Sequence, residues 1–296
     1  MRLTEKWTSY ESKIDESVNF VKQHGHSIYE CRYVRREESQ VVVYLSSHNG
    51  CNMSCRFCHL TSTGQTSMTP VDEYGFDEQS FVVLDYWYRN RRTGNEKTVN
   101  YNFMARGEPL ENPKIRNYGK WMQIRRMLWE NASIDKLVPS YNISTILPKN
   151  GPDLRAYVQD DTKLYWSLYS PLEKFRKRWL PKAMEPGLAA QEINNFREYG
   201  GNVVLHNAFI KDENDTPDQI ASLIHFLRYH DLTDLDYNIV RYNPYDERYG
   251  VESDRVDTIA NILQTVMTGR VQVVPRVGRD CKASCGMFVE ARQLSK

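Results

Sequence analysis

The sequence predicts an α/β protein in which short buried strands alternate with longer helices. Seven apolar runs are typical of buried strands, at residues 41–47, 98–104, 138–145, 163–170, 202–210, 235–242 and 270–277. Polar segments with helical spacing lie between them, at residues 77–89, 117–130, 191–200, 216–230 and 256–267. This alternation favours βα units around a parallel sheet. Six or seven units fit a whole or partial (βα)6-type barrel, with catalytic loops after the strand C-termini, and a doubly wound open sheet is the alternative.

The length of 296 residues suits one large domain with a full core. We expect three parts, namely a short N-terminal extension over 1–40, a core over 41–280 and a C-terminal tail over 281–296. Within the extension, residues from about 10 to 24 have the spacing of a polar amphipathic helix. No low-complexity segment, fixed-period repeat or linker indicates a second domain.

The composition of the chain indicates its cellular compartment and limits the kinds of partner that it could bind. The formal net charge is +1, so a polyanion would have to be bound by local basic patches. The first residues form no apolar leader, and no run of about eighteen apolar residues follows, so we expect a cytoplasmic protein with no membrane association. In a reducing compartment, six cysteines are typical of metal ligands, catalytic thiols or core residues rather than of disulfides. A monomer is expected.

Three of the six cysteines crowd into one short segment. Cys51, Cys55 and Cys58 lie within "GCNMSCRFCH", just after the first apolar run. One interpretation is a zinc site completed by His48 or His59, although structural zinc usually uses two separated ligand pairs. Thiolates also hold 4Fe-4S clusters, and three of them leave one iron open. We favour the cluster.

The CxxxCxxC spacing after a first strand resembles the radical S-adenosylmethionine superfamily. The resemblance implies that the open iron binds the amino and carboxylate groups of S-adenosylmethionine, and that the cluster supplies one electron to cleave it to a 5'-deoxyadenosyl radical. The segment "FMARGEPL" looks like the superfamily's GEP motif, in which Glu108 would receive the methionine amino group. An ordinary strand-to-helix turn, with Pro109 in a first helical turn, is the alternative.

Six ordered segments resemble one branch, the radical S-adenosylmethionine methyl synthases of the RlmN/Cfr-like type. They are "SSHNGCNMSCRFCHLTSTGQ", "YNFMARGEPLENP", "YNISTILP", "WSLYSPLEKFRKRWLP", "NIVRYNPYDERYG" and "PRVGRDCKASCGMF". Members methylate carbon 2 of an adenosine in 23S ribosomal RNA and in transfer RNA, and a sister group methylates carbon 8. The resemblance runs from about Glu30 to Met287. It implies a radical S-adenosylmethionine partial barrel, with a 4Fe-4S cluster and S-adenosylmethionine as cofactors.

The resemblance also implies a set of S-adenosylmethionine contacts. Small hydroxyls and an amide at strand ends can bond ribose hydroxyls and adenine edges without adding charge, but each alone is also typical of ordinary strand ends and turns. The implied contacts are Gly107, Glu108, Ser144, Ser167, Leu168, Tyr169 and Asn243.

Cys285, in "CKASCG", matches the cysteine that family members methylate on sulfur. The resemblance implies that its thiolate takes a methyl group from one cofactor molecule. The radical from a second molecule would abstract a hydrogen from that S-methyl group, and the methylene radical would add to the adenine carbon. A covalent protein–RNA intermediate follows. A buried structural cysteine is the alternative.

One departure from the family concerns the release of that intermediate. The family uses a second cysteine seven residues before the cluster, and this chain has Tyr44 there. A phenol, with an ordinary pKa of about 10, accepts a proton less readily at neutral pH than a thiol at about 8.5. Cys281, Cys31 or Tyr44 itself could serve instead, as could Glu30, which resembles the family's proton-accepting glutamate. Otherwise the chemistry differs and the product is not methyladenosine.

A second departure concerns the RNA substrate, ribosomal or transfer RNA. Family members carry an N-terminal domain that helps to hold RNA, whereas only about forty residues precede the first core strand here. Basic clusters at 89–92, 125–126 and 174–179 could contact phosphates, and Trp179 could stack on an unpaired base. Solvated helix faces are the alternative.

The resemblance further implies a reducing electron donor such as flavodoxin. Three rival interpretations stay open. The chain could catalyse other radical chemistry on a small molecule or DNA, with Cys285 structural. It could be a zinc-containing RNA binder without catalysis, or a degenerate binder that retains cluster and cofactor.

Overall fold

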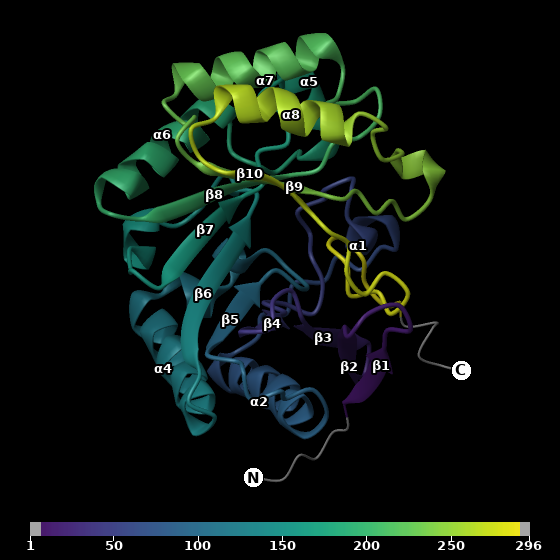
Figure 1. Ribbon diagram of the computed structural model, residues 1–296, viewed down its shortest axis with the longest axis vertical. Helices are drawn as coiled ribbons and strands as arrows, with labels where there is room; N and C mark the ends of the chain where they lie inside the picture. The colour runs from purple at the N-terminus through teal and green to yellow at the C-terminus, as the bar shows by residue number, and fades with distance from the viewer. Residues whose placement is uncertain (1–6, 291–296) are drawn as a thin grey trace. The chain divides into compact units, whose positions relative to one another are not determined.

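The computed structural model describes residues 7–290, and its contacts divide the chain into two compact units (Figure 1). The first unit comprises Met1–Asn52, Gln65–Ile143 and Val277–Lys296, and the second comprises Met53–Gly64 and Ser144–Arg276. The boundary passes through the cysteine-rich segment, so Cys51 belongs to the first unit while Cys55 and Cys58 belong to the second.

The first unit is built on a mixed sheet. Its strands are β1 (Thr8–Glu11), β2 (Val18–His24), β3 (Ser27–Val34), β4 (Gln40–Leu45), β5 (Thr98–Phe103) and β6 (Val138–Thr145), the last of which ends in the second unit. β1 to β4 pair antiparallel in sequence order, whereas β4 with β5 and β5 with β6 pair parallel. The parallel part is buried on both faces, which explains its continuous apolar runs.

Two long helices cover this sheet and lie side by side (Figure 1). The helices of this unit are α2 (Glu73–Asn90), the 3-10 helix η1 (Pro109–Glu111), α3 (Pro113–Arg116) and α4 (Tyr118–Ile134). α2 begins at Asp72, whose carboxylate accepts a hydrogen bond from Gly75 N and caps the helix. Phe76 and Trp87 are buried on its inner face, and such burial stabilises the fold by roughly 1.5–3 kcal/mol for each large side chain.

The helix expected over residues 10–24 is wrong, because this segment forms the β1–β2 hairpin. The Asp15 carboxylate accepts a hydrogen bond from Ser17 N at 2.8 Å and closes the turn between the strands. Val18 and Phe20 then alternate with polar residues as in a strand, and both are buried. The tertiary contacts of these two side chains outweigh the local helical spacing.

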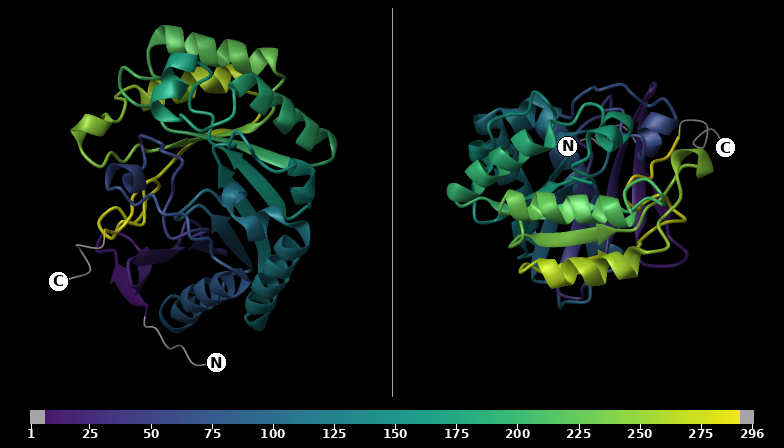
Figure 2. Two further views of the ribbon diagram at one scale, coloured as in Figure 1. Left: turned by 180° about the vertical axis from the view of Figure 1, so that it is seen from behind. Right: turned by 90° about the horizontal axis from the view of Figure 1, so that it is seen from above.

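The second unit holds a parallel sheet and most of the remaining helices. Its strands are β7 (Thr162–Trp166), β8 (Asn202–Asn207), β9 (Asp236–Val240) and β10 (Val271–Val274), paired parallel from β7 to β10. Its helices are α1 (His59–Ser62), η2 (Leu154–Tyr157), α5 (Glu173–Trp179), α6 (Pro186–Glu198), α7 (Pro217–Tyr229), η3 (Glu247–Tyr249) and α8 (Val256–Val266). In the view from above, α7 and α8 run beside one another (Figure 2).

The predicted alternation of strands and helices is confirmed. Each of the seven apolar runs overlaps a strand, and each of the five helical segments overlaps a long helix. Within residues 7–290, no helix is both long and apolar enough to cross a membrane.

Candidate active site

The cysteine loop follows β4 and is folded by backbone hydrogen bonds. In the first unit, Cys51 N donates to Gln65 O at 3.0 Å, and Gly50 has no room for a side chain, because a Cβ there would lie 2.5 Å from the same oxygen. In the second unit, Cys58 N donates to Cys55 O at 3.1 Å, so one tight turn carries both thiols. Cys55 is buried and the other two cysteines are half-buried.

Across residues 7–290, no three His, Cys, Asp or Glu side chains are arranged to hold a single metal ion. The two histidines considered for zinc have other contacts: His48 Nδ1 pairs with Ser47 Oγ at 3.0 Å, and His59 Nε2 with the backbone oxygen of Asn243 at 3.1 Å. Iron–sulfur clusters are bound by cysteine thiolates. In ligand type and sequence spacing, Cys51, Cys55 and Cys58 fit a 4Fe-4S cluster, which stays a prediction.

The GEP segment lies in the loop after β5, in the first unit. Gly107 has a φ of 99°, and a Cβ there would lie 2.5 Å from both His48 Nδ1 and Ser47 Oγ, so only glycine fits. The buried Glu108 carboxylate accepts a hydrogen bond from Leu110 N at 3.3 Å and caps η1, which begins at Pro109. The strand-to-helix turn is thus present, and the methionine-binding role of Glu108 stays a prediction.

Within the second unit, two contacts bring the cysteine loop to predicted cofactor residues. The rings of Phe57 and Tyr169 stack with centroids 4.4 Å apart and planes 10° apart. His59 Nε2 lies 3.1 Å from the backbone oxygen of Asn243. Since Phe57 and His59 flank Cys58, the residues predicted to bind the cluster and the cofactor are neighbours here.

The backbone of Tyr169 is held in an unusual conformation. Its φ is 58°, which costs energy for a bulky residue. Its N–H donates to Asn207 Oδ1 at 2.7 Å, and its carbonyl accepts from Asn214 Nδ2 at 3.2 Å. These two buried amides fix the orientation in which the ring meets Phe57.

The remaining predicted cofactor residues lie at strand ends, as expected. Ser144 is half-buried near the end of β6, and Ser167, just after β7, donates its backbone N–H to Thr145 O at 2.9 Å. Leu168 is fully buried. The side-chain oxygen of Asn243 accepts from Arg276 Nε at 3.0 Å, which fixes the direction of its amide.

Cys285 lies in the segment 277–289, which belongs to the first unit and runs beside the N-terminal strands (Figure 1). The carbonyls of the two preceding residues, Ala283 and Ser284, accept hydrogen bonds from Arg32 Nη1 at 3.1 and 3.2 Å. The residue is exposed, yet desolvation around the sulfur raises the pKa of the Cys285 thiol, while Arg32 and Arg36 oppose the rise. The thiol form therefore dominates at neutral pH.

The residues considered for release of the intermediate differ in their surroundings. Tyr44 is half-buried, and its hydroxyl accepts from Arg36 Nη2 at 3.3 Å. Burial raises the pKa of Cys281 to about 11 and that of Cys31 well above its ordinary value. Cys281 also points its sulfur at Gly278 O, 3.5 Å away. Both thiols have the environment of structural cysteines, and their catalytic use stays a prediction.

Glu30 is completely buried and lies between two arginines. Its carboxylate accepts from Arg106 Nη2 at 2.6 Å and from Arg32 Nη2 at 3.3 Å. Burial acts to raise the pKa of Glu30, but Arg106, Arg32 and further hydrogen-bond donors outweigh it and lower the pKa. Glu30 is therefore ionised throughout the neutral range.

The basic clusters predicted for RNA contact are mostly ion-paired within the protein. Arg89, Arg92 and Arg178 meet Asp85, Asp135 and Glu213 at 2.8, 3.5 and 2.6 Å. Other pairs join Arg91 to Glu11, Arg126 to Glu130 and Lys177 to Glu173. Trp179 is fully buried and donates to Glu213 Oε2, so its expected stacking on a base is wrong for this conformation.

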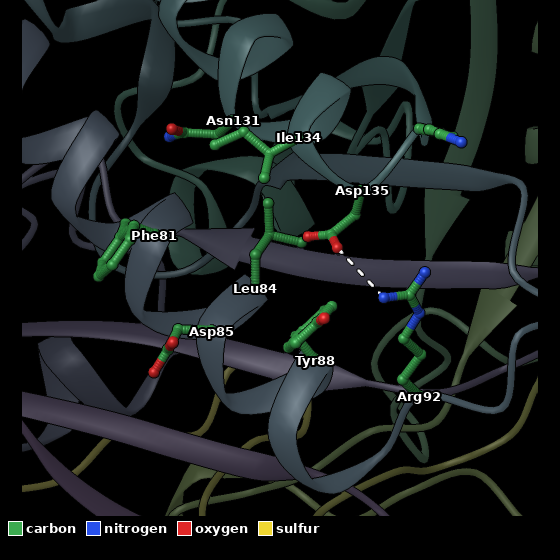
Figure 3. A pocket seen from close by; sticks show the side chains of 9 residues that line it. Phe81, Leu84, Asp85, Tyr88, Arg92, Asn131, Ile134 and Asp135 are labelled. Carbon is green, nitrogen blue, oxygen red and sulfur yellow. Dashed lines mark hydrogen bonds and ion pairs between the residues drawn. The ribbon is translucent and has the colours of Figure 1, made fainter.

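A hollow of about 360 Å³ opens between α2 and α4 in the first unit (Figure 3). Phe81, Leu84, Tyr88 and Ile134 give it an apolar wall, and the Arg92–Asp135 ion pair closes one side, as the dashed line in Figure 3 shows. Of the residues predicted for binding or catalysis, only Arg92, from a basic cluster considered for RNA contact, lines it, and no predicted cluster ligand, cofactor contact or catalytic residue does. This hollow is therefore separate from the candidate active site.

Sequence reasoning missed three residues that organise the site, and it considered His59 only as a zinc ligand. Phe57 could have been found because it adjoins Cys58. Arg106 adjoins Gly107 in the GEP segment, but its burial depends on distant partners. No motif or spacing in the sequence indicated a role for Arg32.

No protein-family model matches the chain. A curated protein of Lachnoclostridium phytofermentans, named a probable dual-specificity RNA methyltransferase RlmN, is 27% identical over 293 residues, covering 94% of this chain and 75% of the relative. The dual-specificity RNA methyltransferase RlmN of Erythrobacter litoralis is 25% identical over 84% of this chain and 62% of its own length.

Solved structures agree with this in fold. A radical SAM methyltransferase from Sphaerobacter thermophilus superposes with a TM-score of 0.76 at 19% identity, covering 96% of this chain and 80% of that one. The native anSMEcpe structure with bound AdoMet gives a TM-score of 0.54 at 12% identity, covering 78% and 63%. The predicted radical S-adenosylmethionine fold is thereby confirmed, and the chain is similar over most of its length to the RlmN-type radical S-adenosylmethionine methyltransferases that its sequence segments resemble.

Proposed function

We propose that this chain is a radical S-adenosylmethionine methyltransferase that acts on an adenosine of ribosomal or transfer RNA and carries the methyl-derived carbon on Cys285. The observation that carries the proposal lies in the second unit, where Phe57 and His59, on either side of Cys58, contact Tyr169 and Asn243. The names of the curated relatives support the reaction class and the RNA substrate.

The chain offers residues for both cofactors. Cys51, Cys55 and Cys58 would hold the 4Fe-4S cluster, and the stacking of Phe57 on the buried Tyr169 ring would position the cysteine loop next to the predicted S-adenosylmethionine contacts. When bound, the cluster and S-adenosylmethionine supply a one-electron cleavage that yields a reactive carbon radical. Reduction would come from a donor such as flavodoxin in the cytoplasm.

Cys285 and Tyr44 would act on the carbon that is transferred. Because its pKa is raised, the Cys285 thiol has to lose its proton before it can attack a methyl group, and Arg32 and Arg36 favour the thiolate. Tyr44, in the position of the family's second cysteine, holds its hydroxyl toward Arg36. Release of a covalent intermediate without a thiol at this position would be slow.

A second candidate function follows from the same substitution. If Tyr44 cannot release an intermediate, the chain would catalyse other radical chemistry on a small molecule or DNA, and Cys285 would be structural. The two functions differ in whether Cys285 becomes S-methylated.

Peptide mass spectrometry tests the proposal directly. The protein, reconstituted with iron and sulfide without oxygen, is incubated with S-adenosylmethionine, a reductant and total RNA. We expect the peptide that contains Cys285 to carry an added methyl group or a linked nucleotide. The same peptide should be unmodified in Cys285→Ala and modified as in the wild type in Cys281→Ala. An unmodified Cys285 beside abundant 5'-deoxyadenosine would instead establish the second function.

A further inference from the structure

A buried charge cluster in the first unit contains one carboxylate and two guanidinium groups. Glu30, Arg32 and Arg106 are at most 1% exposed. Arg106 binds Glu30 Oε1 through Nη2 at 2.6 Å and Nε at 2.8 Å, and Arg32 Nη2 binds Oε2 at 3.3 Å. Two positive charges against one negative leave buried donors that need further acceptors, because an unsatisfied buried charge is costly.

The segment around Cys285 supplies those acceptors. Arg32 donates to the carbonyl of Met287 at 2.6 Å in addition to those of Ala283 and Ser284, and Arg106 donates to the carbonyl of Val289 at 2.5 Å. The Phe288 ring lies 4.9 Å from the Arg32 guanidinium and 5.6 Å from that of Arg106. The chain is therefore held on both sides of Cys285.

Glu30 takes part in this attachment and has no accepting position left. Oε1 also accepts from Val289 N at 2.9 Å, and Oε2 accepts from Asn19 Nδ2 at 3.0 Å. With the arginine contacts, the two oxygens receive five hydrogen bonds, against roughly four lone-pair sites of a carboxylate. A proton from a substrate would have to displace one of these donors.

We propose that Glu30, Arg32 and Arg106 form a buried clamp that positions the Cys285 segment, and that Glu30 is the anion of this clamp rather than a proton acceptor. The lowered pKa of Glu30 agrees with this, since a weak base is a poor proton acceptor at neutral pH. The attachment itself needs no assumption about the reaction, but its importance for methyl transfer rests on the proposed function.

Arg106 extends the clamp to the predicted methionine-binding loop. Its backbone carbonyl accepts from Ser47 N at 2.8 Å, and its Nη1 donates to Asn49 O at 3.2 Å and Gln65 Oε1 at 2.7 Å. Gly107 follows it directly in the chain. One side chain therefore links the loop of Gly107, the strand end before Cys51 and the Cys285 segment, so the clamp sets the place of Cys285 relative to that loop.

The isosteric variant Glu30→Gln tests the clamp by two measurements on the full chain. Hydrogen exchange of peptides covering 277–289, without S-adenosylmethionine, should become about tenfold faster, as expected for the loss of charge-assisted bonds. S-methylation of Cys285 without RNA should slow as well. Glu16→Gln, which removes a half-exposed carboxylate paired with Arg35 at 3.1 Å, should change neither.

A second pair of variants covers the case in which Glu30→Gln does not fold. Val289→Pro removes the N–H that Glu30 accepts, and Val289→Ala loses side-chain packing but keeps that N–H. Faster exchange in Val289→Pro than in Val289→Ala is expected.

Two results would overturn the clamp. One is equal exchange in Val289→Pro and Val289→Ala. The other is a Glu30→Gln protein with normal exchange and normal Cys285 methylation that loses only the RNA product, because it would make Glu30 a proton acceptor. If wild-type Cys285 is never methylated, the proposed function fails, while the exchange data still decide on the clamp.

Discussion

Arg32 and Tyr44 face each other as cross-strand partners in the antiparallel β3–β4 pair. Side chains of such partners project from the same face of the sheet. Arg32 uses its guanidinium to hold the carbonyls of Ala283 and Ser284, so the face that carries Tyr44 is the face on which the Cys285 segment is bound. The tyrosine in the position of the family's second cysteine thus lies on the sheet face that binds the segment of the predicted methyl carrier.

Restoring a thiol at this position should speed the release of a covalent intermediate. Tyr44→Cys replaces a phenol by a group with an ordinary pKa of about 8.5, which exchanges protons more readily near neutral pH. We expect the ratio of released methyladenosine to protein-linked nucleotide, measured by mass spectrometry over time, to rise. Tyr44→Phe keeps the ring and serves as the control. An unchanged ratio in Tyr44→Cys would mean that another residue already performs the release.

Removing the aromatic contact of the cysteine loop should weaken cofactor binding. Phe57→Ala deletes the ring that stacks on Tyr169, and such pairs contribute about 0.5–1.5 kcal/mol beyond buried area, so the Kd for S-adenosylmethionine should rise roughly two- to tenfold. Calorimetry on the reconstituted protein measures this, with iron content as a check on the cluster. Phe81→Ala, on the wall of the separate hollow, is the matched control. Equal affinities in the two variants would show that the contact of Phe57 with Tyr169 does not support cofactor binding.

Substitutions at two glycines with positive φ distinguish the cost of backbone strain from the cost of a steric clash. Gly107→Ala meets His48 and Ser47 at 2.5 Å, whereas Gly94→Ala, at a φ of 89°, meets no atom within 4 Å. Both substitutions lose the conformational freedom of glycine, at a cost of about 1–3 kcal/mol. Only Gly107→Ala also forces neighbouring side chains apart, by typically 1–3 kcal/mol more. Urea unfolding should therefore show the larger loss for Gly107→Ala, and similar losses would contradict the tight contact.

The stability of the protein in acid should depend on Glu96. Burial acts against its charge, but the backbone N–H groups of its loop, Trp87 and Arg35 lower the pKa of Glu96 from 4.5 to about 2. Because the pKa of Glu96 is lower in the folded than in the unfolded protein, its charge stabilises the fold at pH values above the unfolded pKa. This stabilisation is lost as the pH falls from about 4.5 towards 2. Its full size is about 3 kcal/mol, from 1.36 kcal/mol per pKa unit.

Glu96→Gln should accordingly lower the free energy of unfolding at pH 7 and flatten its decline between these two pH values. Urea unfolding at a series of pH values measures both effects. Glu37→Gln removes an exposed carboxylate near the same loop and should leave the curve unchanged. If Glu96→Gln behaves like Glu37→Gln, the loop does not depend on this charge.

The alternating elements could be predicted because their signals are local. Five of the eight positions in the run 138–145 are buried, and they lie on both faces of the sheet, so the composition of the run alone marks β6. The N-terminal hairpin had no such signal, since the alternation of Val18 and Phe20 becomes meaningful only when β3 pairs with β2. In this segment the helical spacing of apolar residues and the pairing of β2 with its neighbouring strands favour different structures, and the strand pairing determines the fold.

For the site, the spacing of Cys51, Cys55 and Cys58 pointed to the loop that contacts Tyr169 and Asn243. The buried cluster could not be predicted in the same way. Glu30 and Arg106 are 76 positions apart, and Arg32 and Met287 are 255 apart. In the sequence Arg32 and Arg106 cannot be told from solvated surface charges, and Glu30 stands out only through the family resemblance. Only the fold shows which of these charges are desolvated.

The clamp also has a consequence for biosynthesis. Val289 meets Glu30 across 259 positions of the chain, so β3 is made long before its last hydrogen-bond partner leaves the ribosome. Until then Glu30, Arg32 and Arg106 lack several acceptors and donors, and the strand that carries Glu30 is incompletely satisfied. Closing a contact of such high sequence separation is slow. The attachment of segment 277–289 to β3 therefore forms only after all strands of the first unit have been synthesised.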